Sequence, residues 1–215
     1  MNANAPRGPA GTGSPPAIRS VFAALAVASL GLLNAVDHLV ARVMPGSWVA
    51  EVRLPSLLTC LALCVASGAA ATLRPRAPTR SALIAGAAWL TGAVLSFTLG
   101  ARFTRFQGTD LVAFLGTGLF AEELLFRGAL LELGRRALPA WRAGPVSLAS
   151  LCAAALFSLS HFQYRGFHAT PVALAQVGIT FPMGLVLGYL REESRSLWPP
   201  SCVHLVSNLI SQVAG

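Results

Sequence analysis

The sequence contains no lysine and little charge of either sign. All 16 basic residues are arginine, eight residues are acidic, and charged residues make up only 11% of the 215 positions. A soluble domain usually carries about 25% charged residues. Hydrophobic residues reach 54%, and the mean hydropathy is +0.64. This shortage of charge excludes an ordinary soluble domain and indicates a protein that lies in lipid.

Several motifs of known hydrolytic and redox sites are also missing. There is no His-Glu-x-x-His, no Gly-x-Ser-Gly and no Gly-x-Gly-Asp. These absences argue against the zincin-type, rhomboid-like serine and aspartyl arrangements of intramembrane hydrolases. No two cysteines form a Cys-x-x-Cys pair, and each lies in an apolar run, so we predict buried free thiols. The cysteines are Cys60, Cys64, Cys152 and Cys202.

The formal charge of +8 is distributed in short gaps between apolar runs. This pattern sets the orientation of a membrane protein and does not form a basic face for nucleic acid. Arginines in alternate gaps number ten on the side of the N-terminus and five on the other side, which predicts a cytoplasmic N-terminus. The larger group is Arg7, Arg19, Arg74, Arg76, Arg80, Arg135, Arg136, Arg142, Arg191 and Arg195, and the smaller is Arg42, Arg53, Arg102, Arg105 and Arg165.

The apolar runs predict an all-α, polytopic transmembrane bundle of about seven helices, with a range of six to eight. A helix needs about 20 apolar residues to cross a core of roughly 30 Å, and most runs reach that length. They cover residues 18–36, 54–73, 81–100, 109–131, 145–161, 171–190 and 197–213. Residues 1–17, rich in Pro, Gly, Ala and Ser, are predicted to be a disordered cytoplasmic tail, and residues 18–215 a single membrane domain. The first run lacks an Ala-x-Ala cleavage site and is interpreted as a retained helix, with a signal peptide as the alternative.

The fourth run carries three ionisable residues in one apolar helix: Glu122, Glu123 and Arg127. Each costs roughly 2.5–3.5 kcal/mol at the middle of a membrane, so such residues need partners and a polar interior. Glu123 and Arg127 are four residues apart and are predicted to form an ion pair. Glu122 is rotated by about 100° from Glu123 and can therefore face a separate task. Taken alone, the group could also be purely structural.

Two other runs present polar groups near their ends. The fifth ends at His161, and the seventh contains His204 and Asn208, whose spacing puts both on one helix face. Each group alone could be a hydrogen-bonded structural residue. Because three separate helices supply such groups and few polar residues lie elsewhere in the runs, we predict that they form one polar site, within a catalytic core at about residues 109–215.

These three motifs resemble those of the CPBP family, the CAAX-protease and bacteriocin-processing intramembrane peptidases, also called the Abi family. They are Glu122-Glu123-x-x-x-Arg127, Phe157-x-x-x-His161 and His204-x-x-x-Asn208, in that order. The resemblance covers about half of the chain, from Thr109 to the C-terminus. It implies an intramembrane endopeptidase, whereas the N-terminal helices match only in being hydrophobic.

The resemblance also implies roles. Glu122 would be the general base that activates water, His161 would share that water, and His204 with Asn208 would stabilise the oxyanion. Glu123 and Arg127 would orient the site. The implied substrate is a membrane-associated or sorting-tail protein with a hydrophobic C-terminal segment, cut near its C-terminus. The bundle itself contacts membrane lipid, and no nucleic acid is expected.

Metal use stays open, because the family is described both as glutamate peptidases and as metallopeptidases. Glu122, His161 and His204 could hold Zn²⁺ with one open position. We favour a reaction without metal, since Asn208 beside His204 suits an oxyanion role. Two non-peptidase alternatives also stay open: a catalytically silent immunity or scaffold protein, and a small proton or solute transporter.

A few expectations concern the rest of the chain. The absence of lysine beside abundant Ala and Arg is typical of a GC-rich genome, so we take the bacterial inner membrane as the location. Gly184 and Gly188 offer a flat helix face for close packing. The charged segment Arg191–Arg195 is expected to be a loop at the membrane surface.

Overall fold

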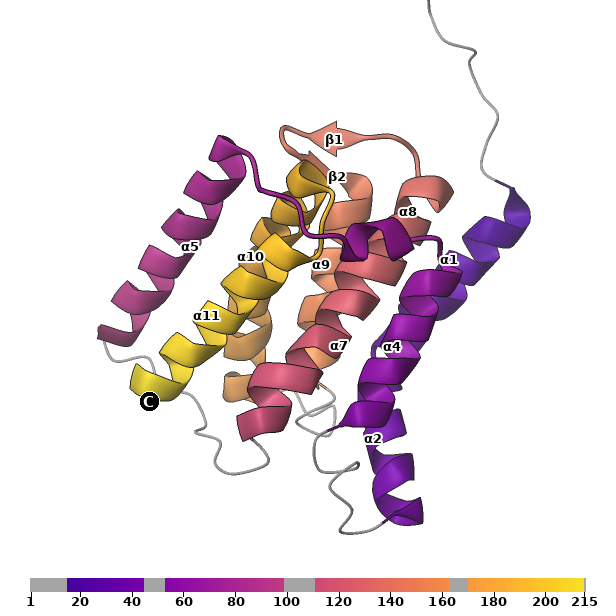
Figure 1. The fold of residues 1–215 in the computed structure, drawn as a ribbon, viewed down its shortest axis with the longest axis horizontal. Helices are drawn as coiled ribbons and strands as arrows, with labels where there is room; N and C mark the ends of the chain where they lie inside the picture. The colour runs from indigo at the N-terminus through magenta and orange to yellow at the C-terminus, as the bar shows by residue number, and fades with distance from the viewer. Residues whose placement is uncertain (1–14, 45–52, 99–110, 163–169, 215) are drawn as a thin grey trace, which may run out of the picture.

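The structure is a computed structural model, and it describes residues 15–44, 53–98, 111–162 and 170–214. The described residues are mostly helical, which confirms the all-α class (Figure 1). The separate helices are α1 (Pro16–Ser29), α2 (Leu32–Val43), α4 (Leu54–Ala66), the 3-10 helix η1 (Ala70–Leu73), α5 (Arg80–Thr98), α9 (Leu148–Ser160), α10 (Pro171–Ser194) and α11 (Trp198–Ala214). A two-stranded hairpin of β1 (Arg142–Ala143) and β2 (Val146–Ser147) precedes α9.

One long helix passes through the middle of the bundle. It consists of η2 (Ala113–Gly118), α7 (Leu119–Glu123), η3 (Leu124–Leu130) and α8 (Leu131–Ala137). The junction residues all keep right-handed helical backbone angles, so these pieces form one rod. The η2 and η3 stretches are π-helical, a rare geometry that frequently occurs at functional sites. Every residue of η3 is buried, because α4 and α9 pack against it.

Length and apolar composition give one clear candidate for a membrane span among the described residues, namely α10. The pair α1 and α2 passes the same test together, but the two helices are bent by 60°. The helices α4, α5 and α9 are apolar and shorter. The predicted number of seven spans is therefore not confirmed.

The first two apolar runs differ in shape from the expectation. The run at 18–36 is not one helix, because the chain turns at Leu30 and Gly31 and α2 then continues to Val43. The run at 54–73 ends as a helix at Ala66, because Gly68 adopts φ +79 and turns the chain into η1. A side chain at Gly68 would also collide with the Arg136 guanidinium, which donates to the Ser67 carbonyl over 2.6 Å. Only the break at Gly68 uses the conformational freedom of glycine, because Gly31 keeps a negative φ of -138.

The helices α9 and α10 make the closest contact in the bundle, through the glycines singled out in the sequence. A Cβ atom on Gly184 would lie 3.0 Å from Ala154 Cα, and one on Gly188 would overlap the Ser150 hydroxyl. Only glycine allows the two backbones to approach this far. This packing fixes α9, which ends at His161, against the rest of the bundle.

The charged segment Arg191–Arg195 is not a surface loop, as α10 continues to Ser194. Arg191 is only 1% exposed, and its Nη2 lies 3.9 Å from Glu132 Oε2 on α8. Glu132 also pairs with Arg136 over 3.0 Å. We call these three residues the Glu132 cluster. The expectation was wrong because Arg191, which directly follows an apolar run in the sequence, is buried by the surrounding helices.

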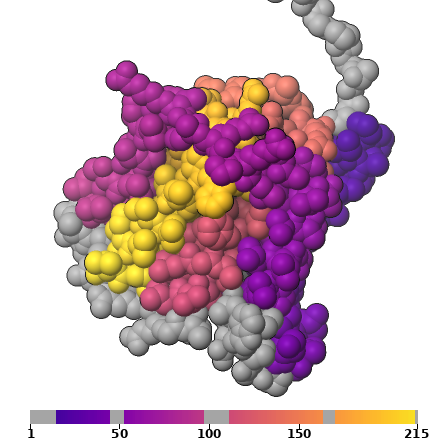
Figure 2. All heavy atoms as spheres, viewed as in Figure 1, coloured from indigo at the N-terminus to yellow at the C-terminus, as the bar shows by residue number. Residues whose placement is uncertain are grey.

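The outer surface suits lipid. Large apolar side chains that are exposed include Val27, Leu39, Leu58, Ile84, Val172 and Leu209, from six different helices. Figure 2 shows α11 at this surface, flanked by α5 and by the central helix. The four cysteines are free as predicted, with Cys60 and Cys64 buried, but Cys152 is only partly buried and Cys202 is exposed.

Candidate functional site

The central helix brings a buried ion pair into the bundle. Glu123 ends α7 and Arg127 lies one turn later in η3, and both side chains are 1% exposed. Arg127 Nη1 lies 3.2 Å from Glu123 Oε1, so the pair expected from the spacing is present. Two charges removed from water this completely need close partners. The helix therefore supplies a fixed pair of opposite charges at the core of the protein.

The α11 helix adds an imidazole that contacts both carboxylates. His204 Nδ1 lies 2.8 Å from Glu123 Oε1, within hydrogen-bond distance. Its other nitrogen, Nε2, lies 3.8 Å from Glu122 Oε2. Because a carboxylate can only accept, Nδ1 carries the proton in this contact. Glu123 thus fixes the ring, and the ring presents Nε2 toward Glu122.

The two neighbouring carboxylates have different surroundings. Glu123 is fully buried between Arg127 and His204. Glu122 keeps 15% of its side chain exposed, so it lies at the margin of the buried cluster. One carboxylate is held as a structural anion, whereas the other can be reached by water or by a substrate.

Phe157 of α9 lies at the centre of the polar groups. The Arg127 Cζ atom is 4.1 Å from the centroid of its ring, which is cation–π geometry. The rings of His161 and His204 meet the same phenyl ring edge-on, with centroids 4.9 and 5.7 Å away. The phenyl ring therefore packs against all three groups, the Arg127 guanidinium and the two imidazoles, and separates them. The motif contained Phe157, but spacing alone did not assign it this role.

His161 and Asn208 complete the set of predicted residues. His161 caps the C-terminal end of α9, and its Nδ1 lies 2.8 Å from the Phe157 carbonyl oxygen. The carbonyl must accept, so Nδ1 carries the proton and Nε2 can accept one. Asn208 is half-buried one turn beyond His204 on the same face of α11. The structure thus places all six predicted residues on three neighbouring elements, with direct contacts among Glu122, Glu123, Arg127 and His204.

Some buried polar atoms of the site have no hydrogen-bond partner among the described residues. They are Glu123 Oε2 and the two terminal nitrogens of Arg127. Buried polar groups are nearly always satisfied, and exceptions deserve a functional reason. These atoms leave donor and acceptor capacity at the centre of the site.

The described residues contain no group of three His, Cys, Asp or Glu side chains arranged to hold a metal ion. The alternative zinc set of Glu122, His161 and His204 does not form such a group, and His204 Nδ1 is already engaged by Glu123. The donors as placed do not fit a zinc site, so the mechanism below includes no metal step.

A hydrogen bond between a tryptophan and a serine supports α11. Trp89 of α5 donates its indole N–H to Ser207 over 3.0 Å, immediately before Asn208. Sequence reasoning missed this pair, since the two residues are 118 positions apart and neither belongs to a motif.

The inner helices of this bundle thus bring two carboxylates, two imidazoles and a guanidinium together among mostly apolar helices. Residues 104–210 match the family model of the type II CAAX prenyl endopeptidase Rce1-like domain. Over these residues the chain belongs to this family, which consists of integral-membrane, CAAX-type intramembrane endopeptidases. No curated protein and no solved structure matches the chain.

Proposed function

We propose that the chain is an intramembrane endopeptidase that hydrolyses a peptide bond near the C-terminus of a membrane-associated substrate. The observation that carries this proposal is the contrast between Glu122 and Glu123. Glu123 is buried and paired with Arg127 and His204. Glu122 is partly exposed and lies beside the His204 imidazole that Glu123 orients. A general base must be accessible, and its neighbours must be rigid.

In the proposed first step, Glu122 takes a proton from a water molecule while the water oxygen attacks the scissile carbonyl carbon. His161 Nε2 accepts a hydrogen bond from the same water, because its Nδ1 is committed to the Phe157 carbonyl. The carbonyl π electrons move onto the oxygen and give a tetrahedral oxyanion. Catalysis of this kind by a positioned base typically contributes about 10²- to 10⁴-fold.

The oxyanion needs fixed donors in a site with little water. The Asn208 amide supplies one, and His204 Nε2 supplies another when both ring nitrogens carry protons. Glu123 at Nδ1 favours that orientation of the ring. Such preorganised donors are worth about 2.7–4 kcal/mol each. Glu122 then passes its proton to the leaving nitrogen, the C–N bond breaks, and a carboxylic acid and an amine leave.

The proposed setting is a bacterial inner membrane, with the N-terminus in the cytoplasm and the bundle in contact with lipid. The proposed substrate is a protein or peptide with a hydrophobic C-terminal segment, and the reaction needs no resident metal. The apolar helices and the exposed apolar side chains on six of them support this setting.

The test compares the C-terminal peptides of membrane and surface proteins in cells that carry the native protein or Glu122→Gln at equal expression. Specific proteins should keep their C-terminal tails only in the variant, with cleavage reduced by about 10²- to 10⁴-fold. Glu193→Gln is the control, because Glu193 is an exposed carboxylate near the end of α10 whose hydrogen-bond donor is Thr79, outside the site. Identical termini in native and Glu122→Gln cells would refute the peptidase proposal and favour the scaffold or transport alternatives.

A further inference from the structure

A second group of polar side chains lies on α2 and at the start of α4, outside the residues that match the family. Asp37 of α2 receives a hydrogen bond from Ser56 of α4 at one carboxylate oxygen. Its other oxygen lies 3.5 Å from Arg53 Nε, at the start of α4. We call these three residues the Asp37 cluster. Nothing in the proposed chemistry uses them.

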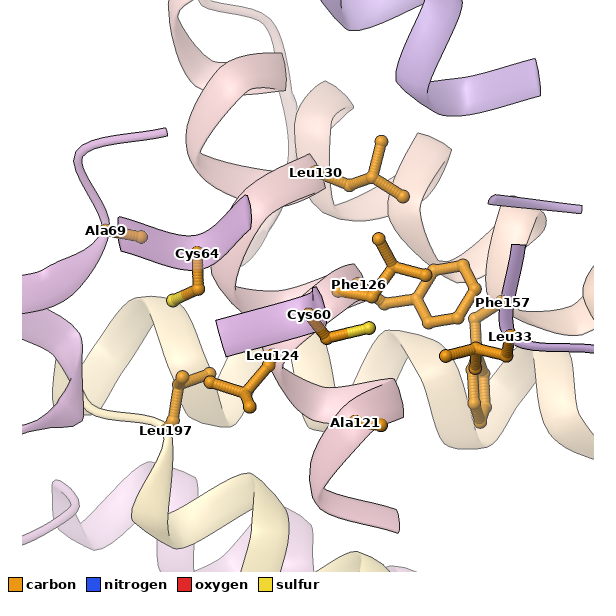
Figure 3. Close-up of a cluster of buried hydrophobic side chains, with 11 residues drawn as sticks. Leu33, Cys60, Cys64, Ala69, Ala121, Leu124, Phe126, Leu130, Phe157 and Leu197 are labelled. Carbon is orange, nitrogen blue, oxygen red and sulfur yellow. The ribbon is translucent and has the colours of Figure 1, made fainter. Parts of the chain in front are cut away.

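This cluster faces the central helix next to the general base. A small pocket lies between them, lined by Leu33, Asp37, Arg53, Ser56, Gly118 and Ala121. Ala121 directly precedes Glu122 in the sequence. Cys60 lies within electrostatic reach of both the Glu122 and the Asp37 carboxylates. Figure 3 shows Leu33, Cys60 and Ala121 in one apolar cluster that joins α2, α4 and α7.

The guanidinium of Arg53 is presented to this pocket. A Cβ atom on Gly118 would lie 3.9 Å from Arg53 Nη1, so the head of the arginine faces the glycine surface. The same Cβ atom would lie 2.6 Å from the Ala113 carbonyl oxygen, so the position has no room for a larger residue. Arg53 keeps 37% of its side chain exposed, which leaves its head accessible.

The backbone of Arg53 supports a functional role. Its angles are φ 55 and ψ 31, the left-handed region that non-glycine residues rarely adopt. Strained residues of this kind cluster at binding and active sites. Because Ser56 and Arg53 engage the two oxygens of Asp37, this carboxylate orients the Arg53 guanidinium through its Nε.

We propose that Arg53, oriented by Asp37, binds the C-terminal carboxylate of the substrate. This inference rests on the proposed function, in which the cut falls near the substrate's C-terminus. A guanidinium fork can hold both oxygens of a carboxylate, and the pocket beside Arg53 combines apolar Leu33 and Ala121 with polar Ser56. The spacing between Arg53 and Glu122 then sets the number of residues in the C-terminal fragment that cleavage releases.

The experiment uses pairs of synthetic peptides with the same hydrophobic C-terminal segment, one ending in a free carboxylate and the other in an amide. Full-length protein in phosphatidylethanolamine and phosphatidylglycerol liposomes is assayed for cleavage by mass spectrometry. Binding is measured separately on Glu122→Gln, which needs no turnover. We expect the acid to be favoured over the amide by about 10- to 100-fold in kcat/KM and in affinity. Arg53→Gln should lower kcat/KM and affinity for the acid peptide to the values for the amide peptide.

The control is Arg42→Gln, because Arg42 is an exposed arginine in the last turn of α2 and does not line the pocket. This variant should keep the preference for the acid. Arg53→Lys keeps the charge without the fork and should show a reduced preference, which answers the question if Arg53→Gln fails to fold.

The outcomes separate the two proposals. Equal use of acid and amide by the native protein, or an unchanged preference in folded Arg53→Gln or Arg53→Lys, would overturn the carboxylate site while peptidase activity stands. If the native protein cleaves neither peptide, the proposed function is in doubt for these probes, and the binding measurement alone decides the carboxylate site. Equal affinity of Glu122→Gln for acid and amide would then reject it.

Discussion

The central helix carries the same charge pattern twice, with opposite surroundings. Glu123 and Arg127 are four residues apart and 3.2 Å from each other, and Glu132 and Arg136 repeat this spacing at 3.0 Å. The first pair is 1% exposed on both sides, whereas the second is 21% and 41% exposed. A shared i,i+4 spacing therefore says which charges pair but not how strongly the protein depends on them.

The partners of the two arginines explain the difference. Arg136 donates to the Ser67 carbonyl and to Glu132, so its charge is satisfied by groups that also connect α8 to the turn after α4. Arg127 faces the Phe157 ring, and its terminal nitrogens have no hydrogen-bond partner among the described residues. The Glu132 cluster is thus suited to joining helices, whereas the buried pair lies among the residues of the proposed site.

The largest effect should follow from breaking the buried pair. Arg127→Gln leaves Glu123 charged without its main partner, and we expect a loss of about 3–5 kcal/mol in unfolding free energy together with loss of cleavage. Denaturant unfolding in detergent measures the first and peptide cleavage the second. The matched change Arg136→Gln serves as the control. Equal losses in the two variants would contradict the contrast between the clusters.

A smaller effect is expected from Phe157→Leu. The change keeps an apolar side chain but removes the cation–π contact with Arg127 and the edge contacts with both imidazoles. We expect a loss of about 1–2 kcal/mol in unfolding free energy, with slower cleavage because the imidazoles lose their spacer. Phe120→Leu removes one edge contact with Trp198 near the surface and provides the comparison. If both variants behave alike, Phe157 packs as an ordinary core residue.

Arg136→Gln itself should cost less than about 1 kcal/mol, because exposed ion pairs contribute little. Cleavage should stay at the native rate. A double-mutant cycle with Glu132→Gln gives the coupling between the two side chains, and a cycle of Glu123→Gln with Arg127→Gln gives the buried value. A coupling as large for the exposed pair as for the buried pair would remove the distinction.

Removal of metal should have no effect. Because the donor atoms of Glu122, His161 and His204 are not grouped as ligands, we expect cleavage to persist after treatment with a chelator. Zinc content of protein purified without added metal or chelator is the accompanying measurement. Stoichiometric zinc, with activity lost on chelation and restored by zinc, would replace the proposed mechanism with a metal-dependent one.

Residue spacing along the sequence correctly predicted the side-chain arrangements that arise within a single helix. The pairing of Glu123 with Arg127 follows from 3.6 residues per turn, and so does the shared face of His204 and Asn208. What spacing could not give is which helices meet. The contact of His204 with Glu123, the central place of Phe157 and the burial of Arg191 all depend on packing between distant segments.

The breaks in the apolar runs were missed for a related reason. Gly31 and Gly68 each lie inside a stretch that is hydrophobic enough to continue as a helix, and hydropathy does not distinguish a straight span from a bent one. The side chain that packs against the turn at Gly68 is Arg136, which lies 68 positions further along the chain and contributes no local signal. For the same reason, the described residues do not confirm the seven predicted spans.

The start of α11 rests on backbone atoms of the segment after α4. Leu197 N–H donates to the Thr72 carbonyl, the Ser196 hydroxyl to the Arg74 carbonyl, and the Trp198 indole to the Leu73 carbonyl. Every residue type, proline included, keeps its carbonyl oxygen, so these three hydrogen bonds depend on the path of the backbone at 72–74 rather than on the side chains there. Substitutions at these positions that preserve the backbone path should therefore leave the start of α11 in place.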